Sequence, residues 1–527
     1  MNAIIMAAGT SSRFVPLSYE TPKGLLKVRG EVLLERQICQ LLEAGISDIT
    51  IVVGYKAESF CYLVDKFGVR LVENEDYLRY NNTSSLIRVL DRLEDTYICS
   101  SDNYFTKNVF LEKEENSYYS ALYSSKDTNE YCMELDGDEI KEVHIGGRES
   151  WYMVGHAYFN KEFSQAFKAI LQEDYAKEET KLGYWEDVFI NHIHQLPKMY
   201  IKRYQPLDLV EFDSLEELRL FDDTYINNTG SAIFHNICSI LNCQEKDIVN
   251  IKPLKKGMTN SSFVFTCEAD KKQYVYRHPG DGTEQFINRD SEYFSMRVAG
   301  ELELDTTFVY MHPKDGWKLS YYISETHPLD YFNDQELEQA LSLLRKLHEA
   351  NVQSKYTYRL WEQAEDFLAK IKNEGIDVAV DFYSLYDMLR QLHQYTLDDG
   401  WEECLNHCDA LADNFLIDSE GKMNLIDWEY SGQGDTAQDI GSFIACSNMD
   451  YDRACTTIQR YLKRKPNIEE LSHYLAYVAI ASYTWYLWAI YQSYHGVDTK
   501  EYMKLWHKYA YLYGEKALKF YEKINVI

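Results

Sequence analysis

Between residues 407 and 427, polar side chains stand at a spacing that suits phosphoryl transfer. His407, Asp409 and Asn414 form the pattern H-x-D-x-x-x-x-N, and Asp427 follows two short apolar runs. An enzyme that phosphorylates a hydroxyl group needs a carboxylate to orient it and accept its proton, and an Asn and a second Asp to hold Mg²⁺. We assign the base role to Asp409 and the metal role to Asn414 and Asp427. Chance is the alternative, because the loop is rich in Asp and Asn.

The elements around this pattern favour the functional interpretation. The apolar run 415–417, a polar turn and the segment Met423-Asn-Leu-Ile predict a β-hairpin that brings the acidic sites together. Upstream, residues 262–267 and 273–277 predict a second hairpin that caps a nucleotide, after a turn-rich break at 256–260. The predicted nucleotide contacts in this break are Gly257, Thr259 and Asn260.

The second hairpin ends at Arg277, where protein kinases have a lysine. A guanidinium is permanently charged and can hold phosphates bidentately. Glu292, in the next helical segment, supplies a carboxylate that we expect to pair with Arg277. As isolated residues, the two are more often a surface ion pair, but their order relative to residues 407–414 favours a nucleotide site.

From about residue 233 to its end, the chain resembles the choline/ethanolamine kinases, a branch of the aminoglycoside-phosphotransferase-like kinases. The residues that carry the resemblance are Arg277, the pattern from His407 to Asn414, Asp427-Trp-Glu-Tyr430 and Trp485-Tyr-Leu-Trp488. A quaternary ammonium cannot donate hydrogen bonds and is best held by aromatic faces. By this resemblance, Tyr430, Trp485 and Trp488 would form a choline cage.

The two tryptophans have a simpler interpretation as well. Residues 473–495 contain no Lys, Arg, Asp or Glu, a composition that also fits a membrane span. The run is rich in tyrosine, and we expect a buried helix instead. Trp485 and Trp488 are three residues apart, so they can share a pocket or simply share a core.

The first half of the chain begins with a different pattern. Residues 2–6 predict a buried strand that runs into a small-residue loop, where backbone N–H groups can approach phosphates. Arg13 and Lys23 follow, and they would neutralise a triphosphate and a departing pyrophosphate. An ordinary strand-to-helix turn is the alternative. The predicted phosphate contacts in the loop are Ala8, Gly9, Thr10 and Ser11.

Alternating strands and helices place this loop in an α/β fold. Residues 32–43 have helical periodicity, whereas 48–53 and 96–100 predict strands. Such alternation indicates a parallel sheet with helices on both faces, with ligands at the carboxyl ends of the strands. Asp102 follows one of these strands and is a natural Mg²⁺ ligand.

Residues 1 to about 225 resemble the nucleotidyltransferases, most closely the bacterial CTP:phosphocholine cytidylyltransferases. The matching strings are Ala7-Ala-Gly9 with Arg13, Thr21-Pro-Lys23, Val53-Gly-Tyr55, Tyr80-Asn-Asn82 with Ser85-Leu86, Ser101-Asp-Asn-Tyr104, Thr128-Asn-Glu-Tyr131, Tyr184-Trp185 and Glu211-Phe-Asp213.

The resemblance implies a role for each part of the first half. The loop with Arg13 and Lys23 would hold the CTP phosphates, and Asn82 and Ser85 would lie by the cytosine and ribose. Asp102 and Asp213 would hold Mg²⁺, with Glu186 or Asp187 as a rival for the second ligand. The family more often has Trp at the position of Tyr131, and a phenol is a weaker cation receptor. The residues implied around the trimethylammonium group are Tyr131, Tyr184, Trp185 and Glu211.

Length and composition fit two domains. The chain has 527 residues, too many for one core. We expect a Rossmann-like nucleotidyltransferase domain at 1–228 and a two-lobed, protein-kinase-like domain at 229–527, whose lobes meet at about residue 330. A net charge of -30 argues against nucleic acid or anionic membrane as a partner. Eleven cysteines and no secretory or lipidation motif predict reduced thiols in the cytoplasm.

The two halves together predict a bifunctional enzyme. Choline and ATP would give phosphocholine, and phosphocholine and CTP would give CDP-choline and pyrophosphate, with Mg²⁺ in both domains. We expect small-molecule partners and no membrane insertion, and the sequence does not specify the oligomeric state. Ethanolamine is a rival substrate, because an ammonium with N–H donors prefers carboxylates. The sequence also leaves room for an aminoglycoside-type kinase fused to a sugar-1-phosphate nucleotidyltransferase, or for a non-catalytic binding protein, which would lack a base or metal ligand.

Overall fold

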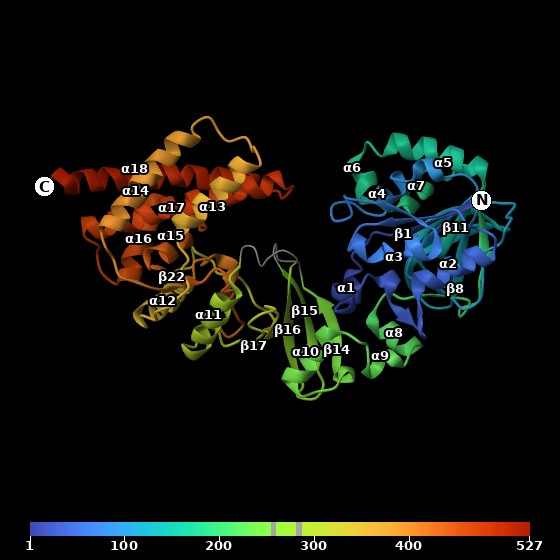
Figure 1. Ribbon diagram of the computed structural model, residues 1–527, viewed down its shortest axis with the longest axis horizontal. Helices are drawn as coiled ribbons and strands as arrows, with labels where there is room; N and C mark the ends of the chain where they lie inside the picture. Colours follow the sequence, from blue (N-terminus) through green and yellow to red (C-terminus); the bar gives the residue numbers. More distant parts are fainter. Residues whose placement is uncertain (255–259, 281–286, 527) are drawn as a thin grey trace. The chain divides into compact units, whose positions relative to one another are not determined.

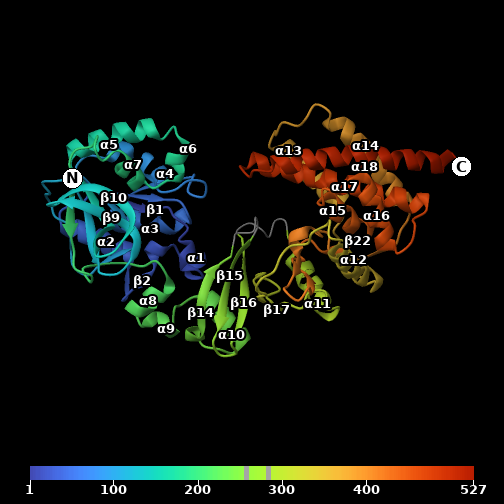
Figure 2. The same ribbon diagram turned by 180° about the vertical axis from the view of Figure 1, so that it is seen from behind.

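The computed structural model describes residues 1–254, 260–280 and 287–526 (Figures 1 and 2). The chain divides into two compact units. The first unit comprises Met1–Pro253 and Phe265–Asp270, and the second comprises Leu254–Val264 and Lys271–Ile527. The domain boundary that we expect after residue 228 stays a prediction.

A nine-stranded sheet organises the first unit, in the order β5-β4-β1-β6-β11-β8-β12-β10-β9. The predicted parallel sheet is confirmed for its first four strands, in which β1 lies between β4 and β6. The other strands are largely antiparallel, because tight turns such as Gly137-Asp138 connect neighbouring strands without a crossover helix. The strands are β1 Asn2–Ala7, β4 Ile49–Val53, β5 Arg70–Glu73, β6 Thr96–Ser100, β8 Tyr118–Ser124, β9 Thr128–Asp136, β10 Glu139–Gly147, β11 Ser150–Phe159 and β12 Tyr200–Arg203.

Helices cover both faces of this sheet (Figures 1 and 2). Successive side chains of a strand point to opposite faces, so each face has its own core. Ile5 belongs to the same buried cluster as Ile38 of α2, whereas Ile4 clusters with Phe163 of α5. The helices are α1 Leu17–Glu20, α2 Leu33–Glu43, α3 Tyr62–Phe67, α4 Thr83–Ile87, α5 Lys161–Asp174, α6 Glu178–Leu182, α7 Trp185–Asn191, α8 Leu215–Phe221, α9 Thr224–Asn227 and α10 Ala232–Leu241.

Short elements complete the first unit at the edge of the sheet formed by the carboxyl ends of its parallel strands. Two turns of 3₁₀-helix carry the predicted phosphate cations, and a small ladder joins β7 to β13. These elements are η1 Ser12–Phe14, η2 Lys23–Leu25, β2 Lys27–Val28, β3 Glu31–Val32, β7 Asn103–Phe105 and β13 Leu209–Glu211, followed later in the chain by β14 Ile248–Pro253.

Helix α10 and strand β14 pack with the first unit. A carboxylate oxygen of Glu20 accepts hydrogen bonds from the backbone N–H groups of Ala232 and Ile233, at 2.8 and 3.2 Å. An acidic group at a helix N-terminus satisfies free donors and complements the helix dipole. Arg219 donates to the backbone carbonyls of Ile248 and Glu245. The segment that leads into the second half of the chain is therefore anchored to the first unit.

His156 gives the first unit a pH-dependent stability. The ring is 1% exposed, its Nε2 lies 3.1 Å from the hydroxyl of Tyr118, and its Nδ1 has no partner among the described residues. Burial lowers the pKa of His156 to about 3. A lowered pKa means that the unfolded chain binds the proton more tightly, so this stability is present above the unfolded pKa of about 6.5 and is lost as pH falls.

We therefore expect wild-type protein to lose about 2 kcal/mol more unfolding free energy than His156→Phe between pH 7 and pH 5. Urea unfolding of the full chain, both proteins at both pH values, measures the difference. Parallel losses in the two proteins would contradict a neutral, buried His156.

The second unit has a small β-layer followed by a helical layer (Figures 1 and 2). The strands of the β-layer follow one another in the order β15-β16-β18-β17, of which β15 belongs to this unit only as far as Val264. Helix α11 follows β16 in the chain. Two short ladders, β19 with β22 and β20 with β21, precede the last helices. Their bounds are β15 Asn260–Cys267, β16 Lys272–Pro279, α11 Arg289–Glu301, β17 Phe308–Met311, β18 Lys318–Tyr321, β19 Glu403–Asn406, β20 Phe415–Ile417, β21 Met423–Leu425 and β22 Gly432–Asp435.

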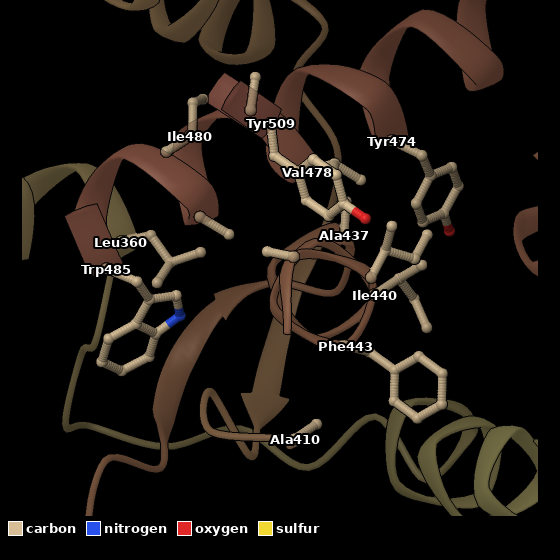
Figure 3. Packing of buried hydrophobic residues seen from close by; sticks show 14 of the residues in the cluster. Leu360, Ala410, Ala437, Ile440, Phe443, Tyr474, Val478, Ile480, Trp485 and Tyr509 are labelled. Atoms are coloured by element: carbon tan, nitrogen blue, oxygen red, sulfur yellow. The ribbon is translucent and has the colours of Figure 1, made fainter. Parts of the chain in front are cut away.

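Helix α17 is the centre of the helical layer. It packs against α13, α14, α15 and α18. Figure 3 shows Val478 of α17 above α15, and Val478, Ile480 and Ile440 of α15 belong to one buried apolar cluster. The predicted buried helix is thus confirmed. Among the described residues, no helix has the length and hydropathy of a membrane span. The bounds are α12 Asp334–Glu349, α13 Leu360–Asn373, α14 Phe382–Asp398, α15 Ala437–Ala445, α16 Tyr451–Leu462, α17 Ile468–Tyr494 and α18 Lys500–Val526.

Two candidate active sites

The predicted hairpin carries the polar residues of the second unit. Strands β20 and β21 pair with Phe415 opposite Leu425, as the sequence predicts. The backbone N–H of Ile426 donates to the carbonyl of Asn414 at 2.9 Å, which places Asp427 close to Asn414. The side chain of Asn414 donates to a carboxylate oxygen of Asp409 at 2.9 Å. The structure therefore brings these three side chains into one site.

A buried carboxylate holds the loop that carries Asp409. The two oxygens of Asp439 accept hydrogen bonds from the backbone N–H groups of His407 and Cys408, at 2.9 and 2.6 Å. His348 also contacts Asp439, at 2.9 Å. Cys408 has a φ of 67°, so the loop turns sharply there and the three contacts stabilise a strained backbone. Sequence reasoning missed Asp439, since it lies on helix α15 and outside the motif.

The charge of Asp427 raises the proton affinity of two neighbouring carboxylates, Asp409 and Glu429. Burial, followed by the charges of Asp427 and Glu429, raises the pKa of Asp409 to about 8. Burial and Asp427 raise the pKa of Glu429 to about 7. Burial alone would raise the pKa of Asp427, but Lys318 and Arg277 hold it below its ordinary value. A bound divalent cation would reverse such upward shifts, so the donor set fits a metal ion.

Arg277 is at the centre of the charged cluster beside this site. Its guanidinium lies 2.5 Å from Glu292, so the expected pair forms, and it donates to the carbonyl of Gly316 at 3.1 Å. It also lies 3.5 Å from Asp427 and 3.6 Å from Glu429. Asn260 donates to Glu429 at 2.9 Å. The predicted contacts Gly257 and Thr259 lie outside the described residues.

The predicted cage residues also lie together. The ring centroid of Trp485 is 6.4 Å from that of Tyr430 and 6.3 Å from that of Trp488. Two aromatic residues that sequence reasoning missed extend the group. Tyr358 lies 5.7 Å from Tyr430, and Trp506 lies 6.3 Å from Trp488. Asp409 contributes to the raised pKa values of both Tyr430 and Tyr358, after burial, so the aromatic group borders the predicted base.

In the first unit, Lys23 contacts Asp102 at the edge of the sheet. The ammonium lies 2.8 Å from one carboxylate oxygen of Asp102, and the other oxygen is buried with no hydrogen-bond partner among the described residues. A Cβ atom at Gly24 would stand 2.9 Å from the Cβ of Ser101, so the glycine permits this close approach. The unpartnered oxygen is an acceptor that fits a hard cation.

Further acidic residues surround Asp102. Glu211 pairs with Asn103 across the β13–β7 ladder, and burial, followed by the charge of Asp102, raises the pKa of Glu211 to about 8. Asp213 also raises this pKa, and Arg13 lies 3.3 Å from Asp213. The two predicted cations thus each contact one of the two predicted metal ligands.

The phosphate loop itself is closely packed at its start. The carbonyl of Ala8 accepts a hydrogen bond from the backbone N–H of Tyr55, and a Cβ atom at Gly54 would stand 3.0 Å from that carbonyl. Ser11 has a φ of 50° and begins the turn of η1. Nothing lies within 4 Å of a Cβ built on Gly9, and Thr10 is half-buried. The loop therefore keeps open space beside Gly9.

Comparison with known proteins separates the two halves. A family model described as "MobA-like NTP transferase domain" matches residues 3–113, and one described as "Choline/ethanolamine kinase" matches residues 251–482. The choline-phosphate cytidylyltransferase of Streptococcus pneumoniae is 33% identical over 43% of this chain and 99% of that protein. The 2-aminoethylphosphonate cytidylyltransferase of Lancefieldella rimae is 36% identical over 43% and 93%. The chain belongs to the cytidylyltransferases and carries a choline/ethanolamine kinase domain.

The solved structure of the choline kinase LicA from Streptococcus pneumoniae is similar to the kinase half. It is 22% identical, covers 55% of this chain and 96% of its own, and superposes with a TM-score of 0.44. The two matched families are transferases, and the chain is a transferase enzyme of mixed α/β fold.

Within the cytidylyltransferase domain, several predicted contacts serve the structure. The side chain of Asn82 accepts from the backbone of Trp185 and donates to Glu186, and the hydroxyl of Ser85 accepts from Asn74. The ring of Trp185 is 3% exposed and stacks on Tyr119. Trp185 therefore belongs to the core, because its faces are covered.

Tyr131 and Tyr184 keep more exposed surface than Trp185. The hydroxyl of Tyr131 donates to Asp187 at 2.7 Å, and the backbone N–H of Tyr184 donates to the same carboxylate. Glu186 accepts from Tyr119 and Asn82. Both rivals for the second metal ligand are thus engaged in other contacts, whereas Asp213 lies near Glu211 and Arg13.

Proposed function

We propose that the chain makes CDP-choline in two successive reactions. The kinase domain would transfer the γ-phosphoryl group of ATP to the hydroxyl of choline. The cytidylyltransferase domain would then join phosphocholine to the α-phosphorus of CTP and release pyrophosphate. The observation that carries the proposal is the aromatic group of Tyr430 and Trp485, whose ring centroids lie 6.4 Å apart. Burial and then the charges of Glu429 and Asp409 raise the pKa of Tyr430, so this ring lies close to the predicted base and suits a quaternary ammonium.

In the kinase domain, Asp409 would accept the proton of the choline hydroxyl as the new O–P bond forms. Asn414 orients its carboxylate, and Asp439 fixes the loop behind it. Asn414 and Asp427 would hold Mg²⁺, which neutralises charge on the phosphates when bound. Among the described residues, no group of three or more His, Cys, Asp or Glu side chains is placed to hold a metal ion. Mg²⁺ commonly uses one or two carboxylates plus phosphate oxygens.

In the cytidylyltransferase domain, a phosphate oxygen of phosphocholine would attack the α-phosphorus in line, and the bond to the β-phosphate would break. Lys23 and Arg13 would neutralise the pyrophosphate as it leaves. Asp102 and Asp213 would hold Mg²⁺ there. This assignment is favoured over Glu186 and Asp187 because those two carboxylates accept part-buried hydrogen bonds from Tyr119 and Tyr131, at 3.1 and 2.7 Å. Asp213 accepts a longer, exposed one from Arg13, at 3.3 Å.

A second candidate has a specific observation in its favour. The hydroxyl of Tyr131 donates a hydrogen bond to Asp187, and Glu211 lies close to Asp102 and Asp213, so the cytidylyltransferase domain offers carboxylates as well as aromatic rings. A primary ammonium donates hydrogen bonds to carboxylates. Ethanolamine is therefore the competing substrate, and one relative bears the name of a 2-aminoethylphosphonate enzyme.

Mass spectrometry of products tests the choice. Purified protein is incubated with Mg²⁺, ATP, CTP and equal amounts of choline and ethanolamine. We expect CDP-choline to dominate. Dominant CDP-ethanolamine would overturn the choice of alcohol, and the absence of any CDP-alcohol would favour an aminoglycoside-type kinase fused to a sugar-1-phosphate nucleotidyltransferase.

Tyr430 provides a matched pair of variants for the aromatic group. Tyr430→Leu removes a ring face, and we expect the KM for choline to rise roughly 2- to 30-fold while the KM for ATP stays unchanged. Tyr430→Phe keeps the ring and should behave like the wild type. Steady-state kinetics with each substrate varied would show this, and equal effects of the two variants would argue against a cation–π contact.

A further inference from the structure

Lys318 is a second cation beside Arg277. The two residues are direct partners across the antiparallel pair β16–β18, so their side chains lie on the same face of the sheet. The ammonium of Lys318 lies 3.6 Å from Asp427 and 3.8 Å from Glu292, and its side chain is 12% exposed. Lys318 thus reaches the same two carboxylates as Arg277.

The contacts of the two cations differ in kind. Arg277 is fixed, because one arm of its guanidinium holds Glu292 at 2.5 Å and also donates to the carbonyl of Gly316. Lys318 has longer ionic contacts and a flexible four-carbon stem that lets an ammonium move between nearby anions. Of the two side chains, Lys318 can more easily exchange its contact with a protein carboxylate for a contact with a bound ligand.

The net charge of the ionic cluster around Arg277 and Lys318 indicates which kind of ligand Lys318 would bind. Each carboxylate in the cluster lies within 4 Å of a cation, so the cluster is close to neutral as it stands. If a divalent metal ion binds Asp427, the cluster gains positive charge, and the phosphates of a nucleotide are the anion that restores the balance. The cluster comprises the cations Arg277, Arg289 and Lys318 and the carboxylates Glu292, Asp427 and Glu429.

We propose that Lys318 binds the β- and γ-phosphate oxygens of ATP in the kinase domain, leaving Asp427 when a metal ion takes that carboxylate. Arg277 then stays paired with Glu292 and holds strand β16 and helix α11 in place beside the site. The proposal rests on the proposed kinase function and adds a nucleotide-binding residue to it.

Equilibrium binding of two ligands tests the role of Lys318. Isothermal titration of the full chain with Mg²⁺ and the β,γ-imido analogue of ATP is compared with titration with AMP, which lacks the β- and γ-phosphates. We expect Lys318→Met to weaken binding of the analogue about 10- to 100-fold, as for a lost charged hydrogen bond, and to leave AMP binding within about twofold. Any heat from the first nucleotide site is common to variant and wild type.

Two further variants make the result specific. Lys318→Arg keeps the charge and should retain most of the affinity for the analogue. Lys272→Met removes an exposed lysine from strand β16 of the same sheet, over the ring of Tyr321, and should change neither ligand's binding. Equal loss of analogue and AMP in Lys318→Met would show that the lysine only maintains the fold, and unchanged analogue binding would also overturn the proposal.

Choline phosphorylation by the wild type tests the proposed function separately. If the wild type phosphorylates choline while Lys318→Met binds the analogue normally, the role of Lys318 is wrong and the kinase function stands. If the wild type phosphorylates neither choline nor ethanolamine, but Lys318→Met loses affinity for the analogue and not for AMP, the nucleotide-binding role stands. The choice of substrate is then wrong.

Discussion

Replacement of Asp409 by Asn abolishes phosphate transfer from ATP to choline and leaves CTP-dependent turnover of supplied phosphocholine unchanged. This is the expected result because the amide cannot accept the hydroxyl proton, and loss of a general base costs about 10²- to 10⁴-fold in rate. Asn has nearly the same shape, so the hydrogen bonds around the loop remain possible. Coupled assays for ADP and for pyrophosphate measure the two reactions in one preparation.

Asp413→Asn is the matched control for this experiment. Asp413 lies four residues along the same loop, so the charge change is the same but the side chain is outside the Asp409–Asn414–Asp427 site. We expect both activities to persist. Loss of cytidylyl transfer in Asp409→Asn would contradict independent active sites, and retained choline phosphorylation would contradict the base role.

Local patterns in the sequence predicted much of this arrangement. The β20–β21 hairpin follows from two short, largely apolar segments around a polar turn, and the order of Arg277 and Glu292 predicted their ion pair. Strand β1 is apolar on both faces and predicted a sheet covered by helices. In each case the signal lies within a few residues of the structure that it specifies.

Other features depend on contacts between distant segments. Asp439 supports the loop of Asp409 from a helix about thirty residues downstream, and no local pattern distinguishes it from an ordinary helix residue. The position of Lys318 beside Asp427 depends on the register of β16 and β18. The resemblance to the cytidylyltransferases implied a headgroup contact for Trp185, but a matching motif cannot tell a ring in a pocket from one stacked in a core. Such distinctions need the three-dimensional packing.

Lys23 provides the converse experiment in the cytidylyltransferase domain. Its ammonium lies 2.8 Å from Asp102 and 5.0 Å from the ring centroid of Phe14, so it is held at the point where the phosphate loop meets the sheet edge. We expect Lys23→Ala to lower CDP-choline synthesis from supplied phosphocholine by about 10²- to 10³-fold, as for removal of one group that stabilises transition-state charge. Choline phosphorylation should persist at the wild-type rate.

Lys27→Ala is the matched control, because Lys27 is an exposed lysine on the neighbouring strand β2. The pyrophosphate assay with CTP and phosphocholine, run on both variants, separates a specific loss from a general effect of charge. Retained CDP-choline synthesis in Lys23→Ala would contradict the role assigned to Lys23. A fall in kcat with an unchanged KM for CTP would show that Lys23 acts on the departing pyrophosphate, whereas a rise in KM alone would assign it to binding of the triphosphate. Its contact with Asp102 favours the first outcome, because a metal ion that takes Asp102 would free the ammonium for the leaving group.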